Sequence, residues 1–168
     1  MAVRKLIQKN VDGSEIEYAG KAASAGAGDS GEFITRDATG KIDPTNFPNG
    51  FGADAVTVTA GEAISAGDFV YFNAAGAVLK ADATIPAKAA RAYSLAAIAN
   101  AGTGPVYFDE SNSSLAALTP GLEYYLSTTA GGVTITPPVV AGQIAQSLGI
   151  ATSATSLHVN IGRPVTRS

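Results

Sequence analysis

The chain offers few side chains that could carry out catalysis. His158 is its single histidine and it has no cysteine, so a zinc site of ordinary ligand composition cannot be assembled. In Leu157-His158-Val159 the histidine alternates with apolar residues, which places it on the opposite side of a predicted strand. A Ser-His-Asp triad would need His158 as its base, and no Gly-x-Ser-x-Gly elbow supplies a nucleophile. We therefore interpret His158 as a structural or surface residue.

The acidic residues form two candidate groups. Asp109 and Glu110 are adjacent, so in a strand they point to opposite faces, and beside residues 111–114 they look solvated. A glycosidase uses two carboxyl groups, but the chain has no tryptophan and few aromatic residues to hold a sugar. Asp37 and Asp43 flank a turn similar to a calcium loop, without the alternating ligands and terminal glutamate of an EF-hand. We predict an ordinary turn there.

Phosphate and nucleic acid are also poor candidates for ligands. Gly26, Gly28 and Gly31 lie in a small-residue tract without the Gly-Lys-Ser/Thr of a phosphate loop, and we interpret the tract as a flexible link. The chain has 11 basic and 14 acidic side chains, a net charge of −3, and neither half offers a basic stripe for phosphates. These observations predict a protein that is not an enzyme and has no cofactor, no metal and no nucleic-acid partner.

The composition indicates which elements position these residues. Hydrophobic residues make up 46% of the 168, but many are alanines, which bury little area. The 19 glycines and 8 prolines interrupt the chain every few residues, and Val, Thr, Ile, Tyr and Phe lie between them, a pattern that favours short strands. No signal peptide and no run of about 18 apolar residues is present, so we expect a soluble protein made in the cytoplasm, with no membrane partner.

Residues 1–53 are predicted to form an extended N-terminal arm. Short apolar pieces alternate with turn-forming runs, and Pro44 and Pro48 exclude a helix or a central strand near the end. Such a segment has too little apolar bulk to bury itself, so it is either disordered or ordered by a partner. We favour the second, with partner-binding anchors at Val3, Leu6, Ile7, Ile16, Tyr18, Phe33, Ile34, Ile42 and Phe47.

Residues 54–168 are predicted to form a mostly β body, a small sandwich or barrel. Strand signals are dense here, and a helical turn is predicted at 86–91 because Pro86 suits its first position. The predicted strands are 55–59, 68–72, 77–80, 92–98, 105–108, 123–127, 133–136, 144–151 and 157–161.

The body also contains a candidate internal repeat. Residues 64–71 align with 118–125, which places Gly67 over Gly121, and residues 75–78 align with 130–133 after one insertion. With small deletions, Ser94-Leu95 falls over Ser147-Leu148. The candidate repeats are 61–111 and 115–163, two hairpin units that could close one core between them. Chance similarity between glycine-rich β segments is the alternative explanation.

Several segments together resemble the virion structural proteins of tailed bacteriophages, in particular capsid decoration (cement) proteins. They include residues 26–43, 47–54, 63–70, 80–84, 124–131, 149–151 and 159–165. The resemblance spans residues 20–165 and rests on the order of segments, without one diagnostic motif. It implies a homotrimer with a β-barrel or β-clip-like body on the capsid surface, which binds the major capsid protein and stabilises the head. The arm would lie over the capsid and neighbouring subunits, so its anchors would be capsid- or subunit-binding residues.

Other functions stay open at this point. A phage tail, baseplate or fibre module uses similar β elements. A carbohydrate-binding module is disfavoured by the lack of tryptophan, and an enzyme would depend on His158 as its only obvious base.

Overall fold

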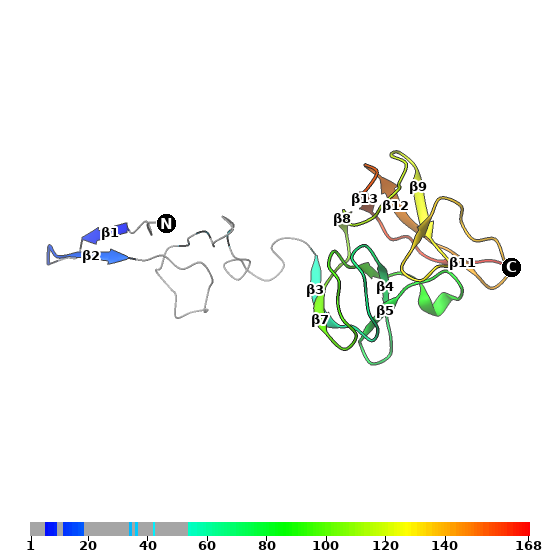
Figure 1. Ribbon diagram of the computed structural model, residues 1–168, viewed down its shortest axis with the longest axis horizontal. Coiled ribbons are helices and arrows are strands. Elements are labelled where there is room, and N and C mark those ends of the chain that lie inside the picture. Colours follow the sequence, from blue (N-terminus) through cyan, green and yellow to red (C-terminus); the bar gives the residue numbers. More distant parts are fainter. Residues whose placement is uncertain (1–5, 10–11, 19–33, 35, 37–41, 43–53) are drawn as a thin grey trace. The chain divides into compact units, whose positions relative to one another are not determined.

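The computed structural model describes residues 6–9, 12–18, 34, 36, 42 and 54–168 (Figure 1). The chain divides into two compact units, Met1–Phe51 and Gly52–Ser168. This division lies two residues before the boundary expected between arm and body.

The N-terminal unit contains a β-hairpin. The sequence predicted only an extended arm here and missed the hairpin. Strands β1 (Leu6–Lys9) and β2 (Glu15–Tyr18) pair antiparallel, with Lys9 opposite Glu15. In the turn, Asp12 Oδ1 accepts hydrogen bonds from the Ser14 hydroxyl at 2.6 Å and the Ser14 amide at 2.9 Å, and both lower the pKa of Asp12. Gly13 adopts a φ of +85°, which glycine allows without strain.

The body consists of two five-stranded antiparallel sheets and is mostly β, as predicted. The first sheet has the order β5-β4-β6-β7-β3 and the second the order β10-β9-β12-β13-β8. Neither sheet closes into a barrel, although an isolated bridge between Ala60 and Val78 joins the edges of the first at one point. The first sheet contains β3 (Ala55–Thr59), β4 (Phe69–Phe72), β5 (Val78–Lys80), β6 (Ala92–Tyr93) and β7 (Thr103–Tyr107). The second contains β8 (Glu110–Asn112), β9 (Glu123–Leu126), β10 (Val133–Thr134), β12 (Ser147–Ala151) and β13 (Leu157–Val159).

Three short elements complete the body. A 3₁₀ turn, η3 (Pro86–Lys88), stands where the helical turn was expected. Strands β11 (Ile144–Ala145) and β14 (Val165–Thr166) pair with each other outside the large sheets. The sequence reading missed β14, and it missed β8 because the segment 110–114 is polar.

Two apolar clusters stabilise the body. The larger contains buried residues of both sheets, among them Phe69 and Tyr93 of the first and Leu126 and Leu157 of the second. The smaller belongs to the first sheet alone and includes Val70. Phe69 and Val70 are neighbours in β4, so the alternation of a strand sends one side chain into each cluster.

The two sheets have the same topology. If the five strands of each sheet are numbered in chain order, both sheets have the same order from one edge to the other: third, second, fourth, fifth, first. The aligned hairpins also share their register, since Phe72 pairs with Val78 and Leu126 with Val133. Sequence match and topology together indicate a tandem repeat, here called repeat 1 (β3–β7) and repeat 2 (β8–β13). The repeats begin at β3 and β8, so they differ from the expected bounds 61–111 and 115–163.

The alignment beyond the hairpins was wrong. Gly67 donates its amide hydrogen bond to Ser94 O, and Gly121 donates to Ala151 O. Because Gly67 and Gly121 are equivalent, Ser94 matches Ala151 and not Ser147. A β-bulge between Ser147 and Gly149 shifts the register of β12, which a comparison of residue types does not reveal.

Both turn glycines have positive φ, +90° at Gly67 and +83° at Gly121. Their surroundings differ. A Cβ at Gly67 would lie 2.4 Å from Ser114 O, whereas one at Gly121 would meet open space. Buried Asn112 donates to Gly67 O at 3.0 Å, so the turn of repeat 1 is held inside the first loop of repeat 2.

Candidate association surface

The predicted anchors of the N-terminal unit fall on several described segments. Leu6 and Ile7 lie on β1, and Ile16 and Tyr18 lie on β2. The side chains of Ile7, Ile34 and Ile42 are exposed. Val3, Phe33 and Phe47 lie outside the described residues.

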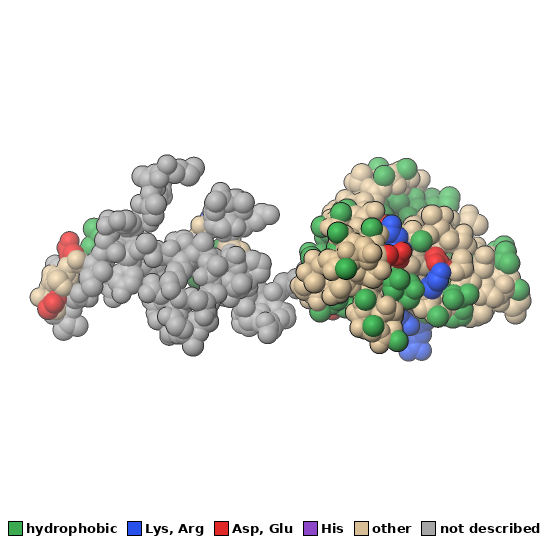
Figure 2. All heavy atoms as spheres, turned by 60° about the horizontal axis from the view of Figure 1, so that its bottom comes forward, with side chains coloured by type: hydrophobic (Ala, Val, Ile, Leu, Met, Phe, Trp, Pro, Cys, Tyr) green, Lys and Arg blue, Asp and Glu red, His purple; other side chains and the backbone are tan. Residues whose placement is uncertain are grey.

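The body has an apolar surface of its own, which the sequence reading missed. Ile135, Val139, Val140 and Val165 are all exposed, and we call them the C-terminal patch. The loop after β10 and the strand β14 lie together because β11 pairs with β14, with Ala145 opposite Val165. Hydrophobic side chains are visible at the right-hand end of the body in Figure 2, the end where Figure 1 marks the C-terminus. The run Ile135-Thr136-Pro137-Pro138-Val139-Val140 could have signalled this surface.

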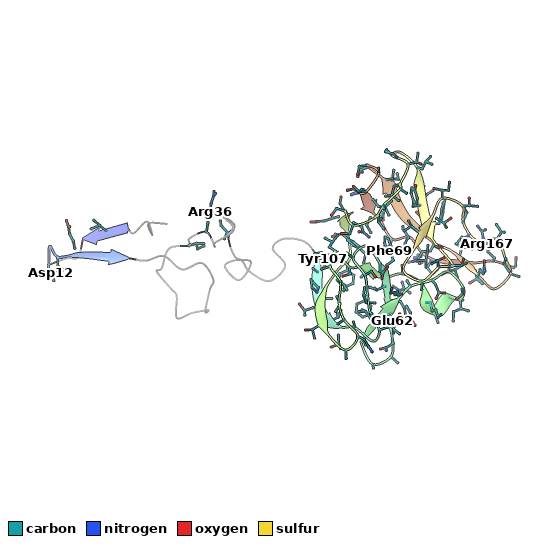
Figure 3. The ribbon with its side chains drawn as sticks, viewed as in Figure 1. Asp12, Arg36, Glu62, Phe69, Tyr107 and Arg167 are labelled. Atoms are coloured by element: carbon teal, nitrogen blue, oxygen red, sulfur yellow. The ribbon has the colours of Figure 1, made fainter. Side chains whose placement is uncertain are left out.

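A hollow of about 380 Å³ adjoins the C-terminal patch and is lined by Thr134, Thr136, Pro137, Pro138, Val139 and Val140, among others. Two hydrogen bonds to backbone carbonyls fix the loop around it. Arg167 Nε donates to Pro138 O at 2.9 Å and Gln143 N donates to Val140 O at 3.1 Å. Arg167 lies at this end of the body in Figure 3. The lining is uncharged, so the hollow is better suited to apolar contact than to catalysis.

The polar side chains that most resemble a catalytic group lie on the outer face of the second sheet. Glu123 accepts hydrogen bonds of 2.6 Å from the Ser147 hydroxyl and from the Tyr125 hydroxyl. These bonds lower the pKa of Glu123 and raise that of Tyr125. His158 is exposed between the buried Leu157 and Val159, as the alternation predicted. A carboxylate held in its charged form is a poor general acid.

A second hollow, of about 330 Å³, lies at the seam between the repeats and is lined by Arg91, Phe108, Asp109 and residues 159–163. Next to it, Tyr93 donates its hydroxyl hydrogen bond to Asp109 O at 2.6 Å. Burial, followed by the charges of Glu110 and Asp109, raises the pKa of Tyr93 to about 12. Tyr93 is therefore a neutral structural donor at ordinary pH.

Within the described residues, no group of three or more His, Cys, Asp or Glu side chains could hold a metal ion. The described part of the chain also has no helix with the length and apolar character needed to cross a membrane. No family model matches the chain, and no curated protein is significantly similar to it.

Proposed function

We propose that the protein is a structural component of a tailed-phage virion that decorates the capsid surface. In this proposal it forms a homotrimer, binds the major capsid protein and stabilises the head without catalysis. The observation that carries the proposal is the exposed apolar surface on both units, at Ile7, Ile34 and Ile42 and at the C-terminal patch. Exposed apolar surface of this kind is typical of proteins that bind other proteins.

The division into two units supports the same proposal. A two-stranded hairpin such as β1–β2 is marginally stable by itself, so binding to a neighbour would stabilise it. Many copies on a lattice would bind with avidity even if each contact were weak. The sequence resemblance of residues 20–165 to phage structural proteins points in the same direction.

The proposal is tested with purified capsids that lack the protein. The full chain is expected to bind in many copies per particle and to raise the temperature at which the capsids release their DNA. Deletion of residues 1–50 is expected to abolish binding. Absence of binding by the full chain would reject the proposal, and a few copies per virion would support a tail, baseplate or fibre module instead.

A further inference from the structure

The hollow at the seam between the repeats, here called the seam hollow, opens where β13 no longer has a neighbouring strand. β8 and β13 lie side by side (Figure 1) and pair as far as Glu110, which is opposite Val159. Before Glu110 the chain turns into repeat 1, and the Tyr93 hydroxyl binds the Asp109 carbonyl oxygen at 2.6 Å. Among the described strands, none therefore pairs with residues 160–163 on the side of β8.

The backbone of residues 160–163 is paired on its other side. Asn160 N donates to Leu148 O and Gly162 N donates to Ser147 O, both at 2.9 Å. These two bonds continue the pairing of β13 with β12. They also show that the segment is extended, because alternate residues of such a segment direct their backbone groups to the same side.

The residues between and after these two direct their backbone groups the opposite way, toward the seam hollow. Ile161 and Arg163 are both among its lining residues. Within the described part of the chain, no hydrogen bond engages the N–H or C=O of Ile161 or the N–H of Arg163. The seam hollow thus contains a short free strand edge, which is a template for pairing with another chain.

Two arginines and an aromatic ring line the seam hollow beside this edge. Arg91 comes from repeat 1 and Arg163 follows β13, and both are exposed. Neither belongs to an ion pair with a described residue. Asp109 is the one carboxylate among the described lining residues, so the lining has one net positive charge. Phe108 supplies an apolar wall and stacks on Phe72, with 6.3 Å between the ring centres.

We infer that the seam hollow binds an extended acidic peptide of a partner protein, which adds a short strand to the free edge at Ile161 and Arg163. In strand addition, main-chain hydrogen bonds supply affinity and the neighbouring side chains supply specificity. A glutamate or aspartate of the peptide lies against Arg91 and Arg163, because a guanidinium group binds a carboxylate through two parallel hydrogen bonds.

Other anions use less of the site. A small free carboxylate would bind the arginines but leave the backbone groups of Ile161 without a partner. A nucleic acid needs a row of basic side chains along its phosphates, whereas Asp109 interrupts the two arginines here. The inference goes beyond the proposed function, since this site includes neither the N-terminal anchors nor the C-terminal patch.

The experiment titrates the full-length protein, without capsids, with the peptide acetyl-Thr-Val-Glu-Val-Thr-amide and follows the backbone amides by NMR. We expect a dissociation constant below about 1 mM and slower hydrogen exchange at the amides of Ile161 and Arg163. The Gly162 amide is an internal control, because it already donates to Ser147 O and should not change. Sodium acetate at the same concentration should leave all three exchange rates unchanged.

The double variant Arg91→Gln/Arg163→Gln is expected to raise the dissociation constant at least about tenfold. The control Arg36→Gln/Arg167→Gln changes the net charge equally outside the seam hollow and should keep the wild-type value. Circular dichroism checks the fold of both, and if the double variant does not fold, Arg91→Gln alone is expected to weaken binding.

The inference is overturned if the peptide does not bind at millimolar concentration, or if it binds without slowing exchange at Ile161 and Arg163. Equal protection by acetate, or equal weakening in the control variant, would overturn it as well. A protein that binds the peptide as expected but ignores capsids would keep this inference and reject the proposed function.

Discussion

At the scale of single residues, the two turn glycines show how equivalent backbone conformations can have different consequences. Both have positive φ, but only Gly67 is enclosed, by Ser114 and by the hydrogen bond from Asn112. The sequence alignment predicted equivalent turns at Gly67 and Gly121. It could not distinguish their surroundings, because these depend on where repeat 2 packs.

We predict that Gly121→Ala lowers the free energy of unfolding by about 1–2 kcal/mol, the cost of a left-handed alanine. Gly67→Ala should lower it by about 3 kcal/mol or more, because its Cβ also meets the Ser114 backbone. Urea unfolding of the two variants measures the difference. Equal losses would show that the enclosure of Gly67 contributes nothing.

Asp82 provides a prediction about pH. Burial pushes the pKa of this carboxyl up, but hydrogen bonds from Thr84 and Lys88 outweigh it and lower the pKa overall. A pKa that is lower in the folded state contributes stability above the unfolded value, about 3.9, and this contribution is lost as the pH falls below it. The wild type should therefore lose more stability than Asp82→Asn as the pH falls below about 4.

Acid titration of the free energy of unfolding measures this difference. Thr84→Val, which removes one of the donor groups to Asp82, should reduce the pH dependence in the same direction. Parallel curves for the wild type and Asp82→Asn would contradict the prediction.

At the scale of elements, the segment 81–91 depends on one buried amide. Gln146 Oε1 accepts from Ala90 N at 2.8 Å, and its Nε2 donates to Ala90 O and to Gly162 O, both at 3.0 Å. The side chain replaces a missing strand partner for Ala90 and is fully buried. It joins the connection of repeat 1 to β12 of repeat 2.

We predict that Gln146→Leu lowers the free energy of unfolding by about 3 kcal/mol, because the buried N–H and C=O of Ala90 and the partly buried C=O of Gly162 lose their partner. Gln143→Leu is the matched control, since the Gln143 side chain is only partly buried, and it should stay close to the wild type. Thermal unfolding of both variants tests the pair. A Gln146→Leu protein of unchanged stability would show that the three groups find other partners.

The strands were predictable where residue types alternate and turns flank them. The predicted segment 55–59 is β3, and 69–72, 78–80 and 123–126 fall within predicted segments. By contrast, β8 contains Glu110, Ser111 and Asn112, and its formation depends on pairing with β13. Tertiary pairing of this kind leaves no signal in local residue preferences.

At the scale of the whole molecule, the two compact units predict independent behaviour. Deletion of residues 1–50 should leave a body that unfolds cooperatively with an unchanged urea midpoint, because both apolar clusters lie within residues 54–168. The measurement is urea unfolding of the full chain and of the truncated chain. An unfolded truncated body would contradict the assignment of residues 1–53 as an arm.

Only part of the candidate surface could be predicted. Apolar anchors in a segment poor in apolar bulk were visible in the sequence. Ile7, Ile34 and Ile42 are exposed, and their role as anchors stays a prediction. The C-terminal patch was not found, because Ile135, Val139 and Val140 have residue types typical of a core. Their exposure depends on how the loop after β10 is placed in the folded body, which residue types alone do not indicate.

The unequal distribution of apolar clusters has a consequence for the order of folding. Repeat 1 has an apolar cluster made of its own residues alone, around Val70 and Ile98. The buried apolar residues of repeat 2 belong instead to the shared cluster, which also contains Phe69 and Tyr93 of repeat 1. Repeat 1 is also synthesised first, so it can collapse before repeat 2 leaves the ribosome. The earlier half would then act as a template on which the later half condenses.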